Sequence, residues 1–229
     1  MGHEIEALAL SWNYEIVAVI DNESDWNTQS DLFQSAEVAL EFTTPATAPD
    51  NILLCFQHKI PVVSGSTGWM ARWDEIVKAC KNYDATFMYS SNYSIGMNIF
   101  FYLNRKTAAV MDRFREYDIS MEEIHHARKL DQPSGTAIKL AEDILRLNKE
   151  KKQWTNQVPD KTDELAIKSI REGKVTGTHI VKYTSAEDEI MLQHMAFNRK
   201  GFASGALTAA SWIKDKKGIF TMNDMLTLD

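Results

Sequence analysis

Ile60-Pro61-Val62-Val63-Ser64-Gly65-Ser66-Thr67-Gly68-Trp69 joins a short apolar run to a glycine-rich turn. The run has the length and the β-branched content of a buried strand, and the turn stands at the carboxyl end of that strand. Open α/β sheets bind their ligands at this end, so the segment indicates a strand with a ligand loop behind it. A plain tight turn, in which glycine supplies a positive φ, would show the same residues.

Strands and helices alternate on both sides of this segment. The expected strands are Glu15–Asp21, Val38–Phe42, Ile60–Ser64 and Ala85–Tyr89, and the expected helices are Met1–Leu10, Pro49–His58 and Met70–Lys81. The strands are too continuously apolar for an exposed sheet, which suits parallel strands covered on both faces. The alternation therefore predicts an α/β fold with a doubly wound parallel sheet.

The N-terminal end of this pattern resembles a dinucleotide-binding domain without its beginning. Such a domain starts with a strand and a G-x-G-x-x-G turn, whereas this chain starts with the helix, and Gly2 would be the third glycine. Asp21 stands where these domains place the carboxylate that binds the ribose, although strand-ending aspartates are also common. We expect a Rossmann-like domain lacking its first strand, as in a chain shortened at its N-terminus.

The alternation stops at the small polar residues 90–98, which we interpret as a hinge. A long helix is expected over 98–114, and a polar loop over 149–161. The other predicted elements are strands at Tyr117–Ile124, Ala166–Ile170, Gly177–Tyr183 and Glu189–Ala196, helices at Thr136–Lys149 and Ala203–Trp212, and an extended tail at Gly218–Leu226. Strands that follow one another through short turns predict an α+β region with a mixed or antiparallel sheet.

The stretch Glu123-Ile124-His125-His126-Ala127-Arg128-Lys129-Leu130-Asp131-Gln132-Pro133-Ser134-Gly135-Thr136-Ala137 concentrates ionisable groups. Histidine titrates near neutrality, and a nearby lysine can share proton transfer with it. Ser134-Gly135-Thr136 has the form of a helix N-cap followed by free main-chain N–H groups, which favour a bound carboxylate. An ordinary turn followed by a capped helix has the same residues.

Composition restricts the possible classes of function. The net charge of −7 argues against a general nucleic-acid binder. The two cysteines, Cys55 and Cys80, lack CxxC spacing and are expected to be buried thiols in a reducing cytoplasm. No signal peptide and no apolar run near 18 residues is present, so we expect a cytoplasmic protein without a membrane partner.

With these parts placed, the chain resembles the 4-hydroxy-tetrahydrodipicolinate reductase (dihydrodipicolinate reductase) family. The family pattern E-x-H-H-x-x-K-x-D-x-P-S-G-T-A matches Glu123–Ala137 throughout, with Gln132 where alanine is frequent. The resemblance spans essentially all 229 residues, and the order of the other signals agrees: Asp21, then Phe42-Thr43, Gly65–Gly68 and Asn92–Gly96. The missing first strand and most of the glycine-rich turn are the main departure.

The resemblance implies two domains and a reaction. Residues 1–92 and 199–229 would form the dinucleotide-binding domain, and residues 93–198 the substrate-binding and oligomerisation domain of a homotetramer. The reaction would be hydride transfer from NADH or NADPH to a small cyclic dicarboxylate with loss of water. Its product would be tetrahydrodipicolinate, in diaminopimelate and lysine biosynthesis.

The same resemblance implies roles for individual residues. His125 would donate the proton, with Lys129 as its acid partner. The substrate's carboxylates would be held by His126, Lys129, Ser134, Gly135 and Thr136. The cofactor would be held by Gly2, Asp21, Gly65, Thr67, Ser90, Asn92 and Tyr93, and no metal is expected.

Asp21 suggests which cofactor is used. Its carboxylate would accept a hydrogen bond from a ribose 2′-OH and repel a 2′-phosphate, and the next residue, Asn22, is not an arginine. We therefore expect NADH to be favoured over NADPH.

Other functions fit part of the pattern. A related two-domain amino-acid dehydrogenase would share the architecture and differ in substrate. An inactive oligomer that binds a dicarboxylate would follow from the incomplete cofactor site. A metal site at His125, His126 and Asp131 is disfavoured, because adjacent histidines rarely face one metal ion.

Overall fold

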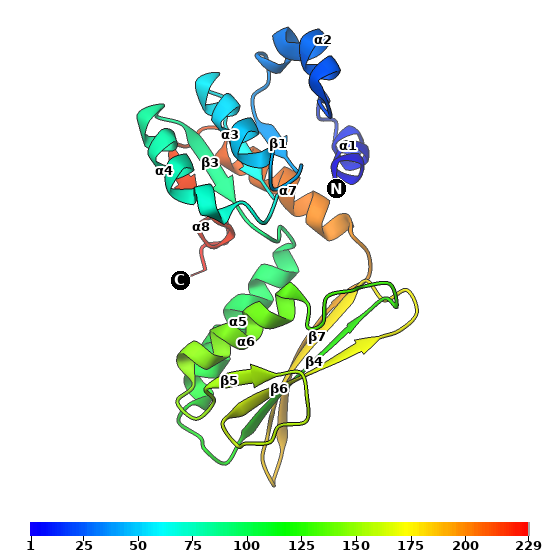
Figure 1. Ribbon diagram of the computed structural model, residues 1–229, viewed down its shortest axis with the longest axis vertical. Coiled ribbons are helices and arrows are strands. Elements are labelled where there is room, and N and C mark those ends of the chain that lie inside the picture. Colours follow the sequence, from blue (N-terminus) through cyan, green and yellow to red (C-terminus); the bar gives the residue numbers. More distant parts are fainter. Residues whose placement is uncertain (229) are drawn as a thin grey trace. The chain divides into compact units, whose positions relative to one another are not determined.

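The computed structural model describes residues 1–228, and within that range the chain divides into two compact units (Figure 1). Unit 1 comprises Met1–Ile95 together with the C-terminal residues from Lys200 onward, and unit 2 comprises Gly96–Arg199. None of the helices in the described part of the chain has both the length and the apolar composition that crossing a bilayer requires. Each unit has its own sheet and its own hydrophobic core.

Unit 1 is built on a parallel sheet whose described strands run in the order β1-β2-β3-β9. These strands are β1 (Ala39–Glu41), β2 (Val62–Ser64), β3 (Thr86–Tyr89) and β9 (Gly218–Phe220). Its helices are α1 (Gly2–Ser11), α2 (Glu23–Phe33), α3 (Ala48–Gln57), α4 (Trp73–Asn82, after the 3-10 turn Met70–Arg72), α7 (Lys200–Ile213) and α8 (Met222–Leu226). The predicted parallel sheet is confirmed.

Alternating side chains of the central strands bury both faces of this sheet. Val62 and Phe87 point into a core formed with α3 and α4, while Val63 and Met88 point into a second core with α1 and α7. Period-two alternation with apolar residues on both faces explains why these strands are continuous apolar runs in the sequence. The sheet is therefore doubly wound.

The prediction of a strand at Glu15–Asp21 is wrong. These residues join no sheet in the described chain, although they include the β-branched run Ile16–Ile20. The side-chain amide of Gln29 instead bonds the main chain of Val19, accepting from its N–H at 3.0 Å and donating to its carbonyl at 2.9 Å. Strand propensity needs a neighbouring strand to pair with, and here a side chain from α2 satisfies the backbone instead.

Two helices of unit 1 have local signals that the sequence prediction overlooked. Helix α2 is capped by Asn22, whose side-chain oxygen accepts from the Asp25 N–H at 3.1 Å. The tail expected to be extended forms strand β9 and then α8, which begins with a capping box between Thr221 and Asp224. Both signatures are visible in the sequence as N-cap residues before acidic first turns.

Unit 2 contains a mixed sheet with the described strand order β5-β6-β4-β7-β8, as expected from the sequence. The strands are β4 (Asp118–His125), β5 (Gln153–Thr155), β6 (Glu164–Arg171), β7 (Gly177–Thr184) and β8 (Glu189–Ala196). β4 pairs parallel with β6 and antiparallel with β7. Strand β5 lies in the segment predicted to be a loop, where Trp154 packs against the core and holds it to the sheet.

Helices α5 (Ile95–Met111) and α6 (Gly135–Leu147) lie side by side on one face of this sheet (Figure 1). Phe101 and Leu140 from these helices are buried with Met121, Ile167 and Val181 from the strands. Helix α5 was expected over residues 98–114. It begins three residues before the expected start and ends at Met111, before the expected end. This packed layer fixes the start of α6 against the carboxyl end of β4.

Close packing of α7 in unit 1 requires a glycine at one position. A Cβ built on Gly205 would lie 1.7 Å from the Tyr93 carbonyl oxygen, whereas one on Gly201 would meet only the Ser94 hydroxyl oxygen, at 3.9 Å. We predict that Gly205→Ala lowers the free energy of unfolding by about 2 kcal/mol or more, because main chain must move. Gly201→Ala in the same helix should change it by less than about 1 kcal/mol. Urea unfolding measures both, and equal effects would contradict the prediction.

Candidate active site

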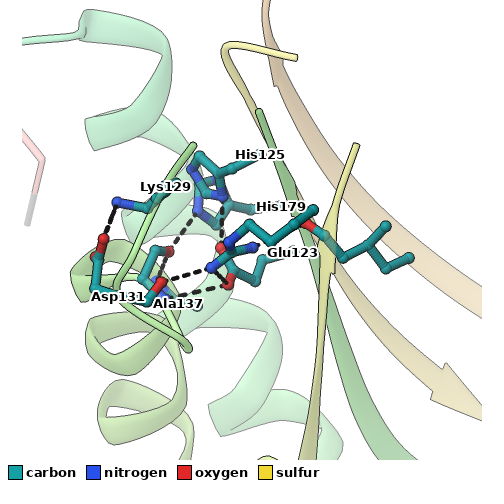
Figure 2. A network of polar contacts seen from close by, with 9 residues as sticks. Glu123, His125, Lys129, Asp131, Ala137 and His179 are labelled. Atoms are coloured by element: carbon teal, nitrogen blue, oxygen red, sulfur yellow. Dashed lines mark hydrogen bonds and ion pairs between the residues drawn. The ribbon is translucent and has the colours of Figure 1, made fainter. Parts of the chain in front are cut away.

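Strand register gathers polar side chains at the carboxyl end of β4. Glu123 and His125 are two residues apart and therefore share a face of the strand. In the neighbouring strands His179 of β7 is paired with Glu123, and Arg171 of β6 is paired with His125. Figure 2 shows Glu123, His125 and His179 converging beside the start of α6, where Ala137 lies. The cluster therefore comes from segments far apart in the sequence.

Glu123 is the buried centre of this cluster. Its Oε1 accepts from Arg171 Nη2 at 2.6 Å and from the Ser134 main-chain N–H at 3.2 Å, and its Oε2 lies 2.5 Å from His125 Nδ1. Burial alone would raise the pKa of Glu123, but the contacts with His125 and Arg171 outweigh it and hold this pKa far below its usual value. Glu123 is therefore a carboxylate at physiological pH.

The Glu123 carboxylate fixes the ring of His125. With Nδ1 against Glu123, the other nitrogen, Nε2, lies beside Gly177, where a Cβ would be 3.0 Å away. The His125 side chain is buried, and its ring centroid lies 5.2 Å from that of His179. A carboxylate that orients one imidazole nitrogen leaves the other for proton transfer, which is the arrangement that general acid–base catalysis uses.

His179 is a neutral member of the cluster. Its Nε2 lies 3.3 Å from the Ser134 hydroxyl oxygen, a hydrogen-bonding distance. Burial, and then the charge on His125, lower the pKa of His179 to about 3. His179 therefore contacts Ser134 as a neutral imidazole at physiological pH.

Ser134 caps helix α6. Its hydroxyl oxygen accepts from the Ala137 N–H at 3.2 Å, and its side chain is buried. Gly135 and Thr136 form the first turn, and no atom lies within 4 Å of a Cβ built on Gly135. Uncapped N–H groups in the first turn of a helix favour a bound anion. The predicted anion cradle thus lies next to the predicted proton donor in unit 2.

Lys129 lies on the loop between β4 and α6. Its Nζ pairs with both carboxylate oxygens of Asp131 at 2.8 Å, and this pair lowers the pKa of Asp131 (Figure 2). Arg171 Nη2 also donates to the Asp131 carbonyl at 2.6 Å and so ties the loop to the sheet. His126 is half-buried just after β4.

The predicted cofactor residues of unit 1 follow the carboxyl ends of β2 and β3. Thr67 is exposed, Gly65 packs beneath Phe42, and Ser90 bonds the main chain of Asn92. The Tyr93 side chain is buried, and its hydroxyl donates to the carbonyls of Ser64 and Met88 at 2.9 and 3.1 Å. Tyr93 therefore joins two strand ends, which leaves only its main chain for a ligand.

The remaining predicted cofactor residues lie near the N-terminus. Gly2 is the exposed first residue of α1, and nothing lies within 4 Å of a Cβ built there. Asp21 is exposed, and its main-chain N–H donates to Asp25 at 3.0 Å. Their predicted contacts with a cofactor stay predictions.

Arg171 and His179 were missed by sequence reasoning. Each belongs to a strand that was predicted in part or in whole, but only the pairing register places it beside Glu123. Ligand atoms of Glu123, His125 and His179 lie within 4.8 Å of one another, a spacing that a metal ion could use. The Arg171 guanidinium already binds this carboxylate and would repel a cation, so the geometry favours proton transfer.

Comparison with known proteins identifies relatives across the whole chain. The family model described as dihydrodipicolinate reductase, N-terminus, matches residues 1–93, and that of the C-terminus matches residues 96–226. A curated 4-hydroxy-tetrahydrodipicolinate reductase from Christiangramia forsetii is 44% identical over 227 residues, 99% of this chain and 94% of that protein. One from Alkaliphilus oremlandii is 35% identical and covers 100% of this chain and 95% of its own length.

A solved structure shares the fold. Dihydrodipicolinate reductase from Paenisporosarcina sp. TG-14, determined with dipicolinate bound, superposes with a TM-score of 0.76 at 22% identity. The match covers 98% of this chain and 94% of that one. At this identity the likeness establishes the two-domain Rossmann-like fold.

The low pKa of His179 predicts a pH dependence of stability. The unfolded chain protonates this histidine below about pH 6.5, whereas the folded protein does so only near pH 3. Between these values the unfolded state binds more protons, so stability falls as the pH is lowered. We predict that His179→Gln removes about 1 kcal/mol per pH unit from this fall between pH 6 and 4.

Urea unfolding at several pH values measures this slope. His3→Gln is the matched control, because the His3 side chain is 96% exposed. The control should keep the wild-type slope. If the free energy of unfolding fell with decreasing pH by the same slope in His179→Gln and wild type, His179 would not be the group that causes the pH dependence.

Proposed function

The chain belongs to the dihydrodipicolinate reductase family, and we infer that it catalyses the nicotinamide-dependent reduction of 4-hydroxy-tetrahydrodipicolinate to tetrahydrodipicolinate. This step belongs to diaminopimelate and lysine biosynthesis. The observation that carries the inference for this chain is the juxtaposition of the Glu123–His125 pair with the N-terminus of α6. Reduction of a cyclic dicarboxylate requires a proton donor for the reaction and an anion-binding site for the substrate's carboxylates.

We propose that unit 2 binds the substrate through its two carboxylates. The main-chain N–H groups of Gly135 and Thr136 and the Ser134 cap support one carboxylate, in the way that helix N-termini hold anions. Lys129 and His126 supply cationic or N–H donors from the loop before it. Several donors converging on one loop suit a dianion better than a neutral ligand.

The bound nicotinamide supplies the hydride. Hydride addition to the conjugated imine formed by loss of water leaves an enamine, whose carbon must take up a proton. His125 is the proposed donor, because Glu123 lies against its Nδ1 and so orients the ring. Lys129 is proposed as the acid partner once it has left Asp131.

The loops of unit 1 fit a dinucleotide in position and in chemistry. Gly65 and Thr67 follow β2, and Ser90, Asn92 and the main chain of Tyr93 follow β3, at the carboxyl ends where open parallel sheets bind ligands. The exposed Thr67 hydroxyl and the main chain of this glycine-containing loop offer polar contacts. We propose these residues, with Gly2 and Asp21, as the cofactor-binding set.

Assembly into a homotetramer is also a proposal. Met191 and Met195 of β8 point to the same face of the sheet of unit 2 and are 48% and 49% exposed. A second copy of this chain is the expected occupant of this face, because exposed methionines on a regular sheet suit an adaptable apolar interface. A location in the cytoplasm stays a prediction.

The proposed role of His125 predicts a specific kinetic defect. His125→Asn should lower kcat by about 10²- to 10⁴-fold, because the enamine loses its proton donor. The affinity for NADH should stay within about twofold of wild type, because unit 1 is unchanged. A coupled assay with freshly made substrate measures turnover, and fluorescence titration measures NADH binding.

Histidine at position 3 again provides a control, and His3→Gln should have wild-type kinetics. A fully active His125→Asn would contradict the assigned role. A wild-type chain that binds the dicarboxylate but neither binds NADH nor turns over would favour the alternative of a non-catalytic oligomer. Turnover of another amino-acid precursor instead would favour a related dehydrogenase.

Asp21 predicts the choice of cofactor. We expect a higher kcat/KM with NADH than with NADPH, because a carboxylate repels a 2′-phosphate. Asp21→Ser should shift the ratio toward NADPH by about tenfold, since one repulsive charge is removed. Initial rates with both cofactors test this, and equal kcat/KM values in the wild type would refute the preference.

A further inference from the structure

A second buried carboxylate lies at the end of β1 in unit 1. The side chain of Glu41 is 5% exposed, yet it belongs to none of the sequence-predicted sites. Its Oε1 accepts from the Thr43 N–H at 2.9 Å, the Thr43 hydroxyl at 2.5 Å and the Ser66 hydroxyl at 2.7 Å. Its Oε2 accepts from the Ser64 hydroxyl at 2.5 Å. Within residues 1–228 these partners are hydroxyl and N–H groups, and none is a cation.

A carboxylate buried without a cation is costly unless donors satisfy it, so its partners must be held in place. These donors come from two loops: Thr43 follows β1, and Ser66 follows β2. The Ser66 hydroxyl oxygen also accepts from the Thr43 N–H at 2.7 Å, so the three residues form a closed network. Thr43 is bonded in turn by Thr47 and Asn51, which extend the network to α3.

Aromatic packing connects the loop after β3 to the same network. A Cβ on Gly65 would lie 2.1 Å from the Phe42 ring, so the loops after β1 and β2 touch without space between them. The Phe42 and Tyr93 ring centroids lie 5.8 Å apart, and Tyr93 bonds the carbonyl of Ser64. If the Glu41 carboxylate were displaced, Ser66 would lose its hydrogen bond to Glu41. The loop after β2, which carries Gly65 and Thr67, would then no longer be held at Ser66.

We propose that Glu41 is a positioning residue for the nicotinamide cofactor. Its carboxylate fixes the loop after β2 relative to the loop after β1, and so sets the main chain of Gly65 and the side chain of Thr67 for cofactor binding. This inference rests on the proposed function, because it takes those two residues as part of the cofactor-binding set. Glu41 itself contacts the loops and acts through them.

Glu41→Gln tests the proposal in the full chain. The amide nitrogen cannot accept a hydrogen bond, so the variant keeps the shape but loses acceptors for part of the network. We expect the Kd for NADH, measured by titration calorimetry, to rise about tenfold or more. The KM for the dicarboxylate should stay within twofold, because unit 2 keeps its site.

Thr86→Val is the matched control for loss of stability. Thr86 is buried in the same sheet, and its hydroxyl donates to the Lys216 carbonyl. Thr86 is the first residue of β3, so it lies at the end of the strand away from the proposed cofactor loops. The control should lower Tm, as we also expect of Glu41→Gln, but keep the wild-type Kd for NADH. A rise in Kd that follows Tm in both variants would reduce Glu41 to a purely structural role and overturn the proposal.

Ser66→Ala provides a second variant that retains the Glu41 carboxylate. It removes the hydroxyl that joins the two loops, so the Kd for NADH should rise in the same direction. Wild-type affinity in both Glu41→Gln and Ser66→Ala would overturn the inference and leave the proposed function intact. A wild-type chain that binds neither NADH nor NADPH would instead refute the proposed function, and this inference with it.

Discussion

The buried carboxylate of Glu123 is the interaction on which the candidate active site depends. It lies at zero exposure, where an ionised group is tolerated only with close partners. Arg171 neutralises it, the Ser134 N–H joins it to α6, and His125 lies against its second oxygen. One side chain thus links two strands, a helix cap and the predicted proton donor, so removal of Glu123 would leave the Arg171 guanidinium, on a side chain only 10% exposed, without its anionic partner.

Local sequence patterns predicted much of this arrangement. Ser134 followed by Gly135 and Thr136 marks the start of α6, and the continuous apolar runs mark β1 to β3, because capping and strand burial depend on neighbouring residues. Arg171 and His179 could not be placed in the same way. Their proximity to Glu123 depends on strand register, which is set by pairing between segments about 50 residues apart.

The errors in the fold have the same origin. Residues 15–21 have strand propensity, but no described strand pairs with them, and the Gln29 amide bonds the main chain at Val19 instead. Glu41 was taken as one residue of the apolar strand Val38–Phe42, because nothing local shows that Ser64 and Ser66 would satisfy its carboxylate. When the structure of a segment depends on a partner distant in the sequence, residue type and spacing within the segment do not identify that partner.

The pair between Lys129 and Asp131 places a competing carboxylate in the loop between β4 and α6, the proposed substrate loop. Both carboxylate oxygens of Asp131 lie 2.8 Å from the Lys129 ammonium group, so a ligand carboxylate that replaced Asp131 would exchange one ion pair for another. Such an exchange provides little net free energy at Lys129 alone. In the proposed complex, affinity would then depend on a simultaneous second contact at the first turn of α6. The proposed substrate loop would therefore discriminate by the number of carboxylates: a ligand with one carboxylate would gain little, whereas a dianion of matching span would gain from both contacts at once.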